Sequence, residues 1–186
     1  MNLYSTIRRI LNEETQKPKI LEFPSLEFFD NDPFEAWKII QKILQRKGNP
    51  PYSIGGDLVL EKKPVKSLGN LQSVGGSLFL PRTPIKSLGN LTSVGGNLDL
   101  MDTPIKSLGN LQSVGKGLYL AYTPIESLGN LQSVGKGLYL QKTSIETLGS
   151  LESVGGDLYL QGTPLSTMYT GEQIGEIVNV GGDIYL

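Results

Sequence analysis

The chain has 186 residues, a formal net charge of −1, and neither cysteine nor histidine. A charge so close to zero gives no global field for nucleic acid or an anionic membrane, and the missing cysteines exclude disulfides and thiolate zinc sites. Because histidine is the commonest general base and metal ligand, its absence leads us to expect no metal site and no cofactor.

The first 49 residues predict a helical capping segment. A short helix is expected over residues 3–14, with apolar residues on one side: Leu3, Ile7, Ile10 and Leu11. The stretch from Lys19 to Asn31 is apolar and broken by proline, which indicates a packed loop or a short strand.

A second helix is predicted between Asp32 and Gly48. Asp32 suits the N-cap, Pro33 the first helical position, and Glu35 follows three residues after the cap. Gly48 supplies the C-terminal stop. The apolar face consists of Phe34, Trp37, Ile40 and Leu44. We interpret the two helices as a cap over the open edge of a repeat array, rather than as a membrane contact or a partner helix.

Residues 50–186 repeat themselves every 20 residues. A half unit comes first, and the last unit holds 24 residues. The full units begin at Lys63, Thr83, Thr103, Thr123, Thr143 and Thr163. Periodic units of this length predict a solenoid, in which each unit packs on its neighbours.

Each unit places apolar side chains at the same six positions. In the unit from Thr83 to Asp102 they are Ile85, Leu88, Leu91, Val94, Leu98 and Leu100. The alternation around Leu98 and Leu100 predicts a short strand, and Pro84 should end the parallel ladder because proline has no N–H. One unit cannot enclose six apolar side chains, whereas stacked units bury them in continuous columns.

These units resemble leucine-rich repeats. The stretch Leu98–Ile105, "LDLMDTPI", is similar to the strand-and-turn signature of that family, with Thr103 at the usual asparagine position. The 20-residue period is similar to the short repeats of bacterial leucine-rich repeat effectors. The resemblance implies an α+β leucine-rich-repeat solenoid with a single parallel β-sheet and an N-terminal helical cap. The Gly-Gly or Gly-Lys-Gly step before the strand departs from those repeats and leaves a flatter β-solenoid as an alternative.

The positions whose residue varies between units should point outward from the strand. In leucine-rich repeat proteins this outward side is the concave sheet face, which is used for binding. Neighbouring units place them about 4.8 Å apart. Tyrosine is enriched at recognition surfaces, so we predict a partner-binding face. Its candidate residues are Phe79, Asp99, Tyr119, Tyr122, Tyr139, Gln141, Lys142, Tyr159 and Tyr185. Aromatic stacking that only stabilises the sheet is the competing interpretation.

We expect no enzyme, because the carboxylates are scattered and no phosphate-binding glycine motif precedes a helix. The leading hypothesis is a non-catalytic protein-binding module with an unidentified protein partner. The alternatives are a structural or self-assembling spacer and a binder of a regular surface such as a glycan. Lys116 and Lys136 beside tyrosines could suit a nucleic acid strand, which the net charge disfavours.

The outer strand edge of the last unit has no further unit to pack against it. Either its insert, "TGEQIGEI", forms a helical turn that shields the edge, or the last strand pairs weakly with another copy. No apolar run approaches the ~20 residues of a membrane span, and the first residues lack the apolar core of a signal peptide. We therefore expect a cytoplasmic protein of bacterial or phage origin, or one exported into a host cell if it is an effector.

Overall fold

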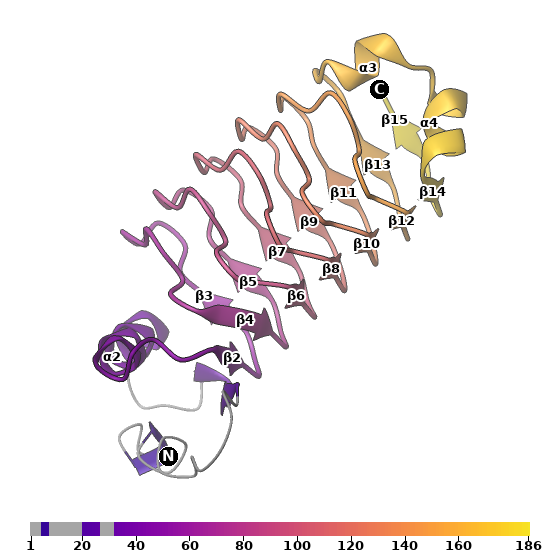
Figure 1. The fold of residues 1–186 in the computed structure, drawn as a ribbon. Coiled ribbons are helices and arrows are strands. Elements are labelled where there is room, and N and C mark those ends of the chain that lie inside the picture. The colour runs from indigo at the N-terminus through magenta and orange to yellow at the C-terminus, as the bar shows by residue number, and fades with distance from the viewer. Residues whose placement is uncertain (1–4, 8–19, 27–31) are drawn as a thin grey trace.

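The computed structural model describes residues 5–7, 20–26 and 32–186. Residues 50–186 form a stack of coils that follow one another in a nearly straight row (Figure 1). The repeat solenoid with parallel strands is confirmed, and so is helix near the N-terminus. The structure differs from the prediction in having two parallel sheets, where a single sheet was expected.

Each coil contributes one short strand to each sheet. The serine sheet, as we name the first, has eight strands among the described residues: β1 (Leu21–Phe23), β2 (Tyr52–Ile54), β4 (Leu71–Val74), β6 (Ser93–Val94), β8 (Ser113–Val114), β10 (Ser133–Val134), β12 (Ser153–Val154) and β14 (Asn179–Val180). The tyrosine sheet has seven there: β3 (Leu58–Val59), β5 (Leu78–Phe79), β7 (Leu98–Asp99), β9 (Leu118–Tyr119), β11 (Leu138–Tyr139), β13 (Leu158–Tyr159) and β15 (Ile184–Tyr185).

The repeat register is kept from coil to coil. Leu98 pairs with Leu118, and Leu118 with Leu138, so equivalent side chains lie one above the next. All six apolar positions of the unit beginning at Thr83 are buried. Because the same positions are buried in the neighbouring coils, one hydrophobic core runs through the stack between the two sheets.

Glycine is required where the chain leaves the serine sheet. A Cβ added at Gly95 would overlap the carbonyl oxygen of Gly75 in the coil before, and one at Gly115 would overlap that of Gly95. The backbones pass each other too closely for any side chain at this column. The repeated glycines are therefore a condition of coil stacking and not a sign of a flexible spacer.

The turns after the tyrosine-sheet strands β5 to β13 are each held by a buried threonine. The Thr103 hydroxyl donates to the Leu100 carbonyl at 2.7 Å, and the backbone N–H of Thr103 donates to the same oxygen. The residue just before the threonine has a positive φ, as at Tyr122 (61°) and Lys142 (55°). This left-handed conformation disfavours side chains, and only the last coil places a glycine there, Gly162.

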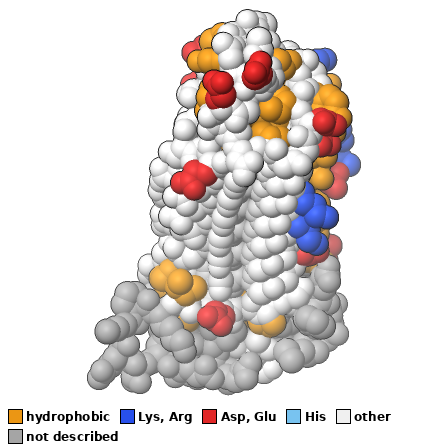
Figure 2. Space-filling model, turned by 90° about the vertical axis from the view of Figure 1, so that its right-hand side faces the viewer, with side chains coloured by type: hydrophobic (Ala, Val, Ile, Leu, Met, Phe, Trp, Pro, Cys, Tyr) orange, Lys and Arg blue, Asp and Glu red, His pale blue; other side chains and the backbone are white. Residues whose placement is uncertain are grey.

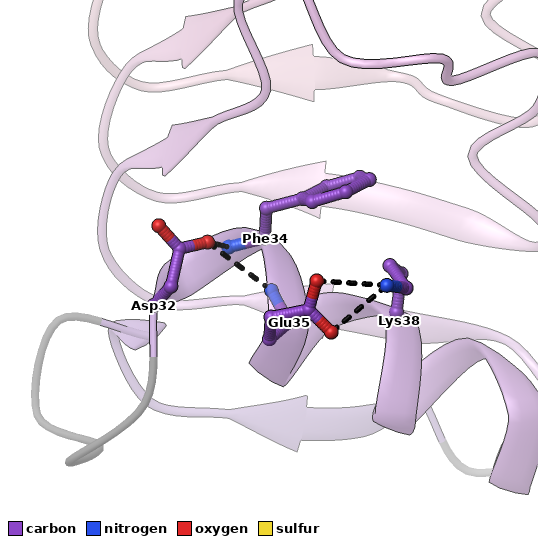
Figure 3. Close-up of polar contacts among 4 residues, drawn as sticks. All are labelled: Asp32, Phe34, Glu35 and Lys38. Atoms are coloured by element: carbon purple, nitrogen blue, oxygen red, sulfur yellow. Dashed lines mark hydrogen bonds and ion pairs between the residues drawn. The ribbon is translucent and has the colours of Figure 1, made fainter.

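The N-terminal cap contains helix α2 (Pro33–Arg46), which contacts strand β3. Asp32 caps the helix by accepting from the N–H groups of Phe34 and Glu35, as predicted. Glu35 does not reach back to the cap, because both of its oxygens accept from Lys38 at 2.8 Å (Figure 3). The buried face of α2 is Ala36, Trp37, Ile40, Gln41 and Leu44.

Two other predicted elements at this end are only partly described. Residues 5–7 are helical, and the remainder of the helix predicted over residues 3–14 lies outside the described residues. Within the segment predicted as packed loop or short strand, β1 pairs with β2 and extends the serine sheet by one strand. The cap thus joins the solenoid through a strand as well as through a helix.

The lengthened last coil carries two short helices, α3 (Leu165–Met168) and α4 (Gly171–Ile177). Thr170 caps α4 with a capping box that includes Gln173, and Ile174 is buried. Figure 1 shows α4 beside β14, and the two elements are in contact. The predicted helical turn is present. The predicted self-association through the last strand stays a prediction.

Candidate functional site

The outward side chains of the tyrosine sheet form a single row. Strand pairing places Phe79 beside Asp99, and Asp99 beside Tyr119. The row continues through Tyr139, Tyr159 and Tyr185. We call this row the tyrosine face. It brings six of the nine candidate residues into one line, each one coil from the next.

The four tyrosines stack on one another as a ladder. The ring centroids of Tyr119 and Tyr139 are 4.6 Å apart, and those of Tyr139 and Tyr159 are 4.7 Å apart. Tyr185 adds a further ring at 4.6 Å from Tyr159. The ring planes of all three pairs lie within 9° of parallel. Because neighbouring rings cover one another's faces, the ladder presents ring edges and hydroxyls to solvent.

The surroundings of the ladder favour neutral phenols. Partial burial raises the pKa of Tyr119, and the neighbouring Tyr139 and Asp99 add to the shift. Burial and the hydrogen bond to the Asp157 carboxylate raise the pKa of Tyr159 to about 12. The Asp183 carboxylate is the main cause of the raised pKa of Tyr185. These three phenols therefore keep their protons at neutral pH and can donate hydrogen bonds.

Asp99 interrupts the aromatic row between Phe79 and Tyr119. Its carboxylate accepts from the N–H of Met101 at 3.0 Å. Half-burial raises the pKa of Asp99 despite this hydrogen bond, and the nearby carboxylates of Glu61 and Asp102 raise it further. Asp99 therefore bounds the ladder on the N-terminal side with a partly buried acid.

The remaining three candidates lie around the turn that follows the tyrosine sheet. Tyr122 is 56 % exposed, and the Lys142 ammonium lies 5.1 Å from its ring centroid. Gln141 is half-buried, and its side-chain oxygen has no hydrogen-bond donor within the described residues, which also holds for Gln161. These residues adjoin the tyrosine face but belong to a separate edge of the coil.

Sequence reasoning missed a polar column just before the second strand of each coil. Where it carries a side chain, that side chain accepts a hydrogen bond from the next coil's backbone: Asp57 from the Ser77 N–H, Ser77 from Asn97, Asn97 from Gly117, and Asp157 from Asp183. We call these positions the corner column. Its members are Asp57, Ser77, Asn97, Gly117, Gly137, Asp157 and Asp183. The third residue of the Gly-Gly-x or Gly-Lys-Gly step in each coil is the sequence signal for it.

A second concave feature runs along the serine sheet. It is a groove of about 520 Å³ whose walls repeat the same three residue types, represented by Ser113, Val114 and Gly115. Figure 2 looks onto the side where β6 to β14 lie in Figure 1, and few charged or hydrophobic side chains interrupt its middle. This groove lacks titratable side chains and has no counterpart among the predicted site residues.

Three observations bear on other kinds of site. Within the described part of the chain, no group of three or more acidic side chains could hold a metal ion. No helix among the described residues has the length and apolar content of a membrane span. A smaller hollow of about 250 Å³ lies beside α2 and includes Trp37, Lys38 and Lys42.

Comparison with known proteins adds no relative. The chain matches no protein family, and neither the curated proteins nor the solved structures include a match. The functional argument therefore rests on the geometry of this chain alone.

Proposed function

We propose that the protein is a non-catalytic protein-binding module that docks a partner across several coils of its tyrosine face. The observation that carries this proposal is the in-register row of half-exposed aromatic side chains on a stacked scaffold. Stacked rings have already lost most of their rotational freedom, so a partner would immobilise few side chains on docking. Tyr119, Tyr139 and Tyr159 are the expected anchors.

A structural role is the second candidate, and one observation favours it. The rings stack at 4.6–4.7 Å on one another, and such pairs stabilise a sheet whether or not a partner exists. A spacer of this kind would depend on the number of coils. A binder would depend on particular coils, above all those that carry Tyr119 and Tyr139.

The experiment is affinity capture from extracts of the source cell. The intact chain is compared with the double variant Tyr119→Ala, Tyr139→Ala, and circular dichroism verifies that both are folded. A matched control carries Ser113→Ala and Ser133→Ala in the same coils, on the serine sheet. We expect the tyrosine variant alone to lose its partner. Equal capture by all three chains would contradict the proposal.

The resemblance to leucine-rich repeats belongs to this proposal too. It is supported by the paired leucines of each tyrosine-sheet strand and by the buried threonine that bonds the turn carbonyl where that family has asparagine. A bacterial or phage origin, and a place in the cytoplasm or in a host cell, follow from this resemblance only. Binding to a glycan lacks a supporting side-chain arrangement of its own.

A further inference from the structure

The coils of Tyr119 and Tyr139 differ from their neighbours at the corner column. Other coils place two glycines and then a polar side chain there, as in Gly155–Asp157. These two coils read Gly-Lys-Gly instead, with Lys116 before Gly117 and Lys136 before Gly137. Each coil thus has one side chain at the corner, and in these two it is a lysine.

The coil that follows these two has a carboxylate at the corner column, Asp157, and shows which groups it contacts. One oxygen of Asp157 accepts from the N–H of Asp183 in the next coil at 2.9 Å. The other oxygen accepts from the Tyr159 hydroxyl of its own coil at 3.1 Å. A single carboxylate therefore bridges the backbone of one coil and the tyrosine ladder of the other.

The Gly-Lys-Gly coils keep the donors of this arrangement and lack its acceptor. Among the described residues, nothing accepts a hydrogen bond from the N–H of Gly137 or from the hydroxyls of Tyr119 and Tyr139. Each hydroxyl lies near its corner glycine, because a Cβ added at Gly117 would be 2.9 Å from the Tyr119 oxygen. The backbone N–H of Asp157, in the coil that follows, also has no acceptor within the part of the chain that the structure describes.

The lysines of the two Gly-Lys-Gly coils carry the positive charge that would attract a carboxylate. Lys116 and Lys136 are exposed, and neither is in an ion pair within the described residues. The coil before carries Asp99 in the tyrosine face, and the coil after carries Asp157 in the corner column. The positive stretch is therefore two coils long, and each lysine comes three residues before the ladder tyrosine of its coil.

We propose that this two-coil patch binds carboxylate side chains of an acidic segment in the partner protein, which take the place that Asp157 fills in its own coil. The patch consists of Lys116, Tyr119, Lys136, Tyr139 and the N–H groups of Gly137 and Asp157. This inference rests on the proposed function, and it adds the chemistry of the partner. A carboxylate that accepts from a hydroxyl and an N–H forms charge-assisted hydrogen bonds, which are stronger than neutral ones. The acids in the flanking coils, Asp99 and Asp157, limit the contact to one or two carboxylates of such a segment.

The test uses a hexaglutamate peptide, acetylated and amidated at its ends, as probe. It is titrated into the ¹⁵N-labelled full chain, and the amide shifts of Gly117, Gly137 and Asp157 are followed. We expect saturating shifts at Gly137 and Asp157 that hexalysine and sulfate at the same ionic strength do not produce. Shifts spread evenly over the exposed lysines, or equal shifts with sulfate, would overturn the proposal.

A coil swap supplies the matched variant. Lys136→Gly with Gly137→Asp converts this coil into the Gly-Gly-Asp sequence that the chain already folds at residues 155–157. Its built-in carboxylate should fill the place and weaken hexaglutamate binding about tenfold or more. The control Lys66→Gln, Lys86→Gln removes two lysines from another column and should change the affinity less than about twofold. A swap that binds the probe as tightly as the intact chain would overturn the proposal.

The two proposals fail in different ways. If the coil swap still captures the cellular partner while the double tyrosine variant does not, protein binding stands and the carboxylate site falls. If neither change affects capture, the tyrosine face is not the docking surface, whatever the peptide titration shows. Loss of capture in both variants supports both proposals.

Discussion

The two sheets are built from the same coils, yet only one of them has an outward surface that changes along the stack. On the serine sheet the outward residues are nearly constant, with glycine recurring in each coil and serine in all but the last, which has Asn179. On the tyrosine sheet the outward position reads valine, phenylalanine and aspartate before the four tyrosines begin. The constant glycines are fixed by backbone contact between coils, whereas side chains at the outward position of the tyrosine sheet extend away from the neighbouring backbones and can vary.

The largest expected loss of stability comes from substituting one of the constant glycines beside the serine sheet. Gly115→Ala places a methyl group against the Gly95 carbonyl and forces the coils apart, so we expect a loss of about 1–3 kcal/mol in the free energy of unfolding. Urea denaturation measures it. Gly175→Ala is the control, because nothing lies within 4 Å of its added Cβ in helix α4, and it should gain about 0.5–1 kcal/mol.

On the variable side, Tyr139→Ala removes a ring that stacks on two neighbours. We expect a loss of about 1–2 kcal/mol, because each stacked pair contributes beyond its buried area. The companion Ser133→Ala alters the serine sheet of the same coil and should stay within about 0.5 kcal/mol of the parent. A larger loss for the serine variant would reverse the roles assigned to the two sheets.

A smaller effect is expected at the turn that follows the tyrosine sheet. Lys142 has a φ of 55°, and the last coil has Gly162 at the equivalent position. Replacing Lys142 by glycine relieves the left-handed strain but adds freedom to the unfolded chain, for a net gain of about 0.5–1 kcal/mol. Lys106→Gly, at a position without positive φ, should not stabilise. Calorimetry that found Lys142→Gly destabilising would show that the cation over the Tyr122 ring matters more than the strain.

The pH dependence of the free energy of unfolding tests the ladder in the alkaline range, and no effect is expected at neutral pH. The pKa of Tyr159 is about 12 in the folded chain, compared with 10.0 for a free tyrosine. Because the pKa of Tyr159 is higher in the folded chain than in the unfolded chain, the contribution of this phenol to stability is complete below pH 10. It is lost as the pH rises toward 12. Tyr159→Phe should flatten this alkaline decline in denaturation experiments, whereas Tyr122→Phe, outside the ladder, should leave it unchanged. An identical decline in both variants would count against the Tyr159–Asp157 contact.

Much of the stack could be predicted from the sequence because it depends on side chains that repeat. The 20-residue period and the buried columns of Leu98 and Leu100 follow from apolar positions alone. The second sheet could not, because each of its strands has a single apolar residue in most coils, and backbone contact between coils forms them. A pair such as Ser93–Val94 has no alternation for a pattern to detect.

The candidate site was predictable to a similar extent. The tyrosine row follows from the period, since residues 20 apart must share a face. The corner column was not predicted, because its role depends on a hydrogen bond from one coil to the next, such as that from the Asp183 N–H to Asp157. The left-handed turn was hidden by the variety of residues that adopt it, which include Arg82, Asp102 and Tyr122.

The most direct measurement is hydrogen–deuterium exchange of the full chain with and without its captured partner. Our account predicts slowed exchange in the tyrosine-sheet segments around Tyr119 and Tyr139, including the Gly137 amide, with the serine-sheet segments unchanged. Protection confined to the serine–glycine groove, around Ser113 and Ser133, would contradict the assignment of the tyrosine face as the docking surface.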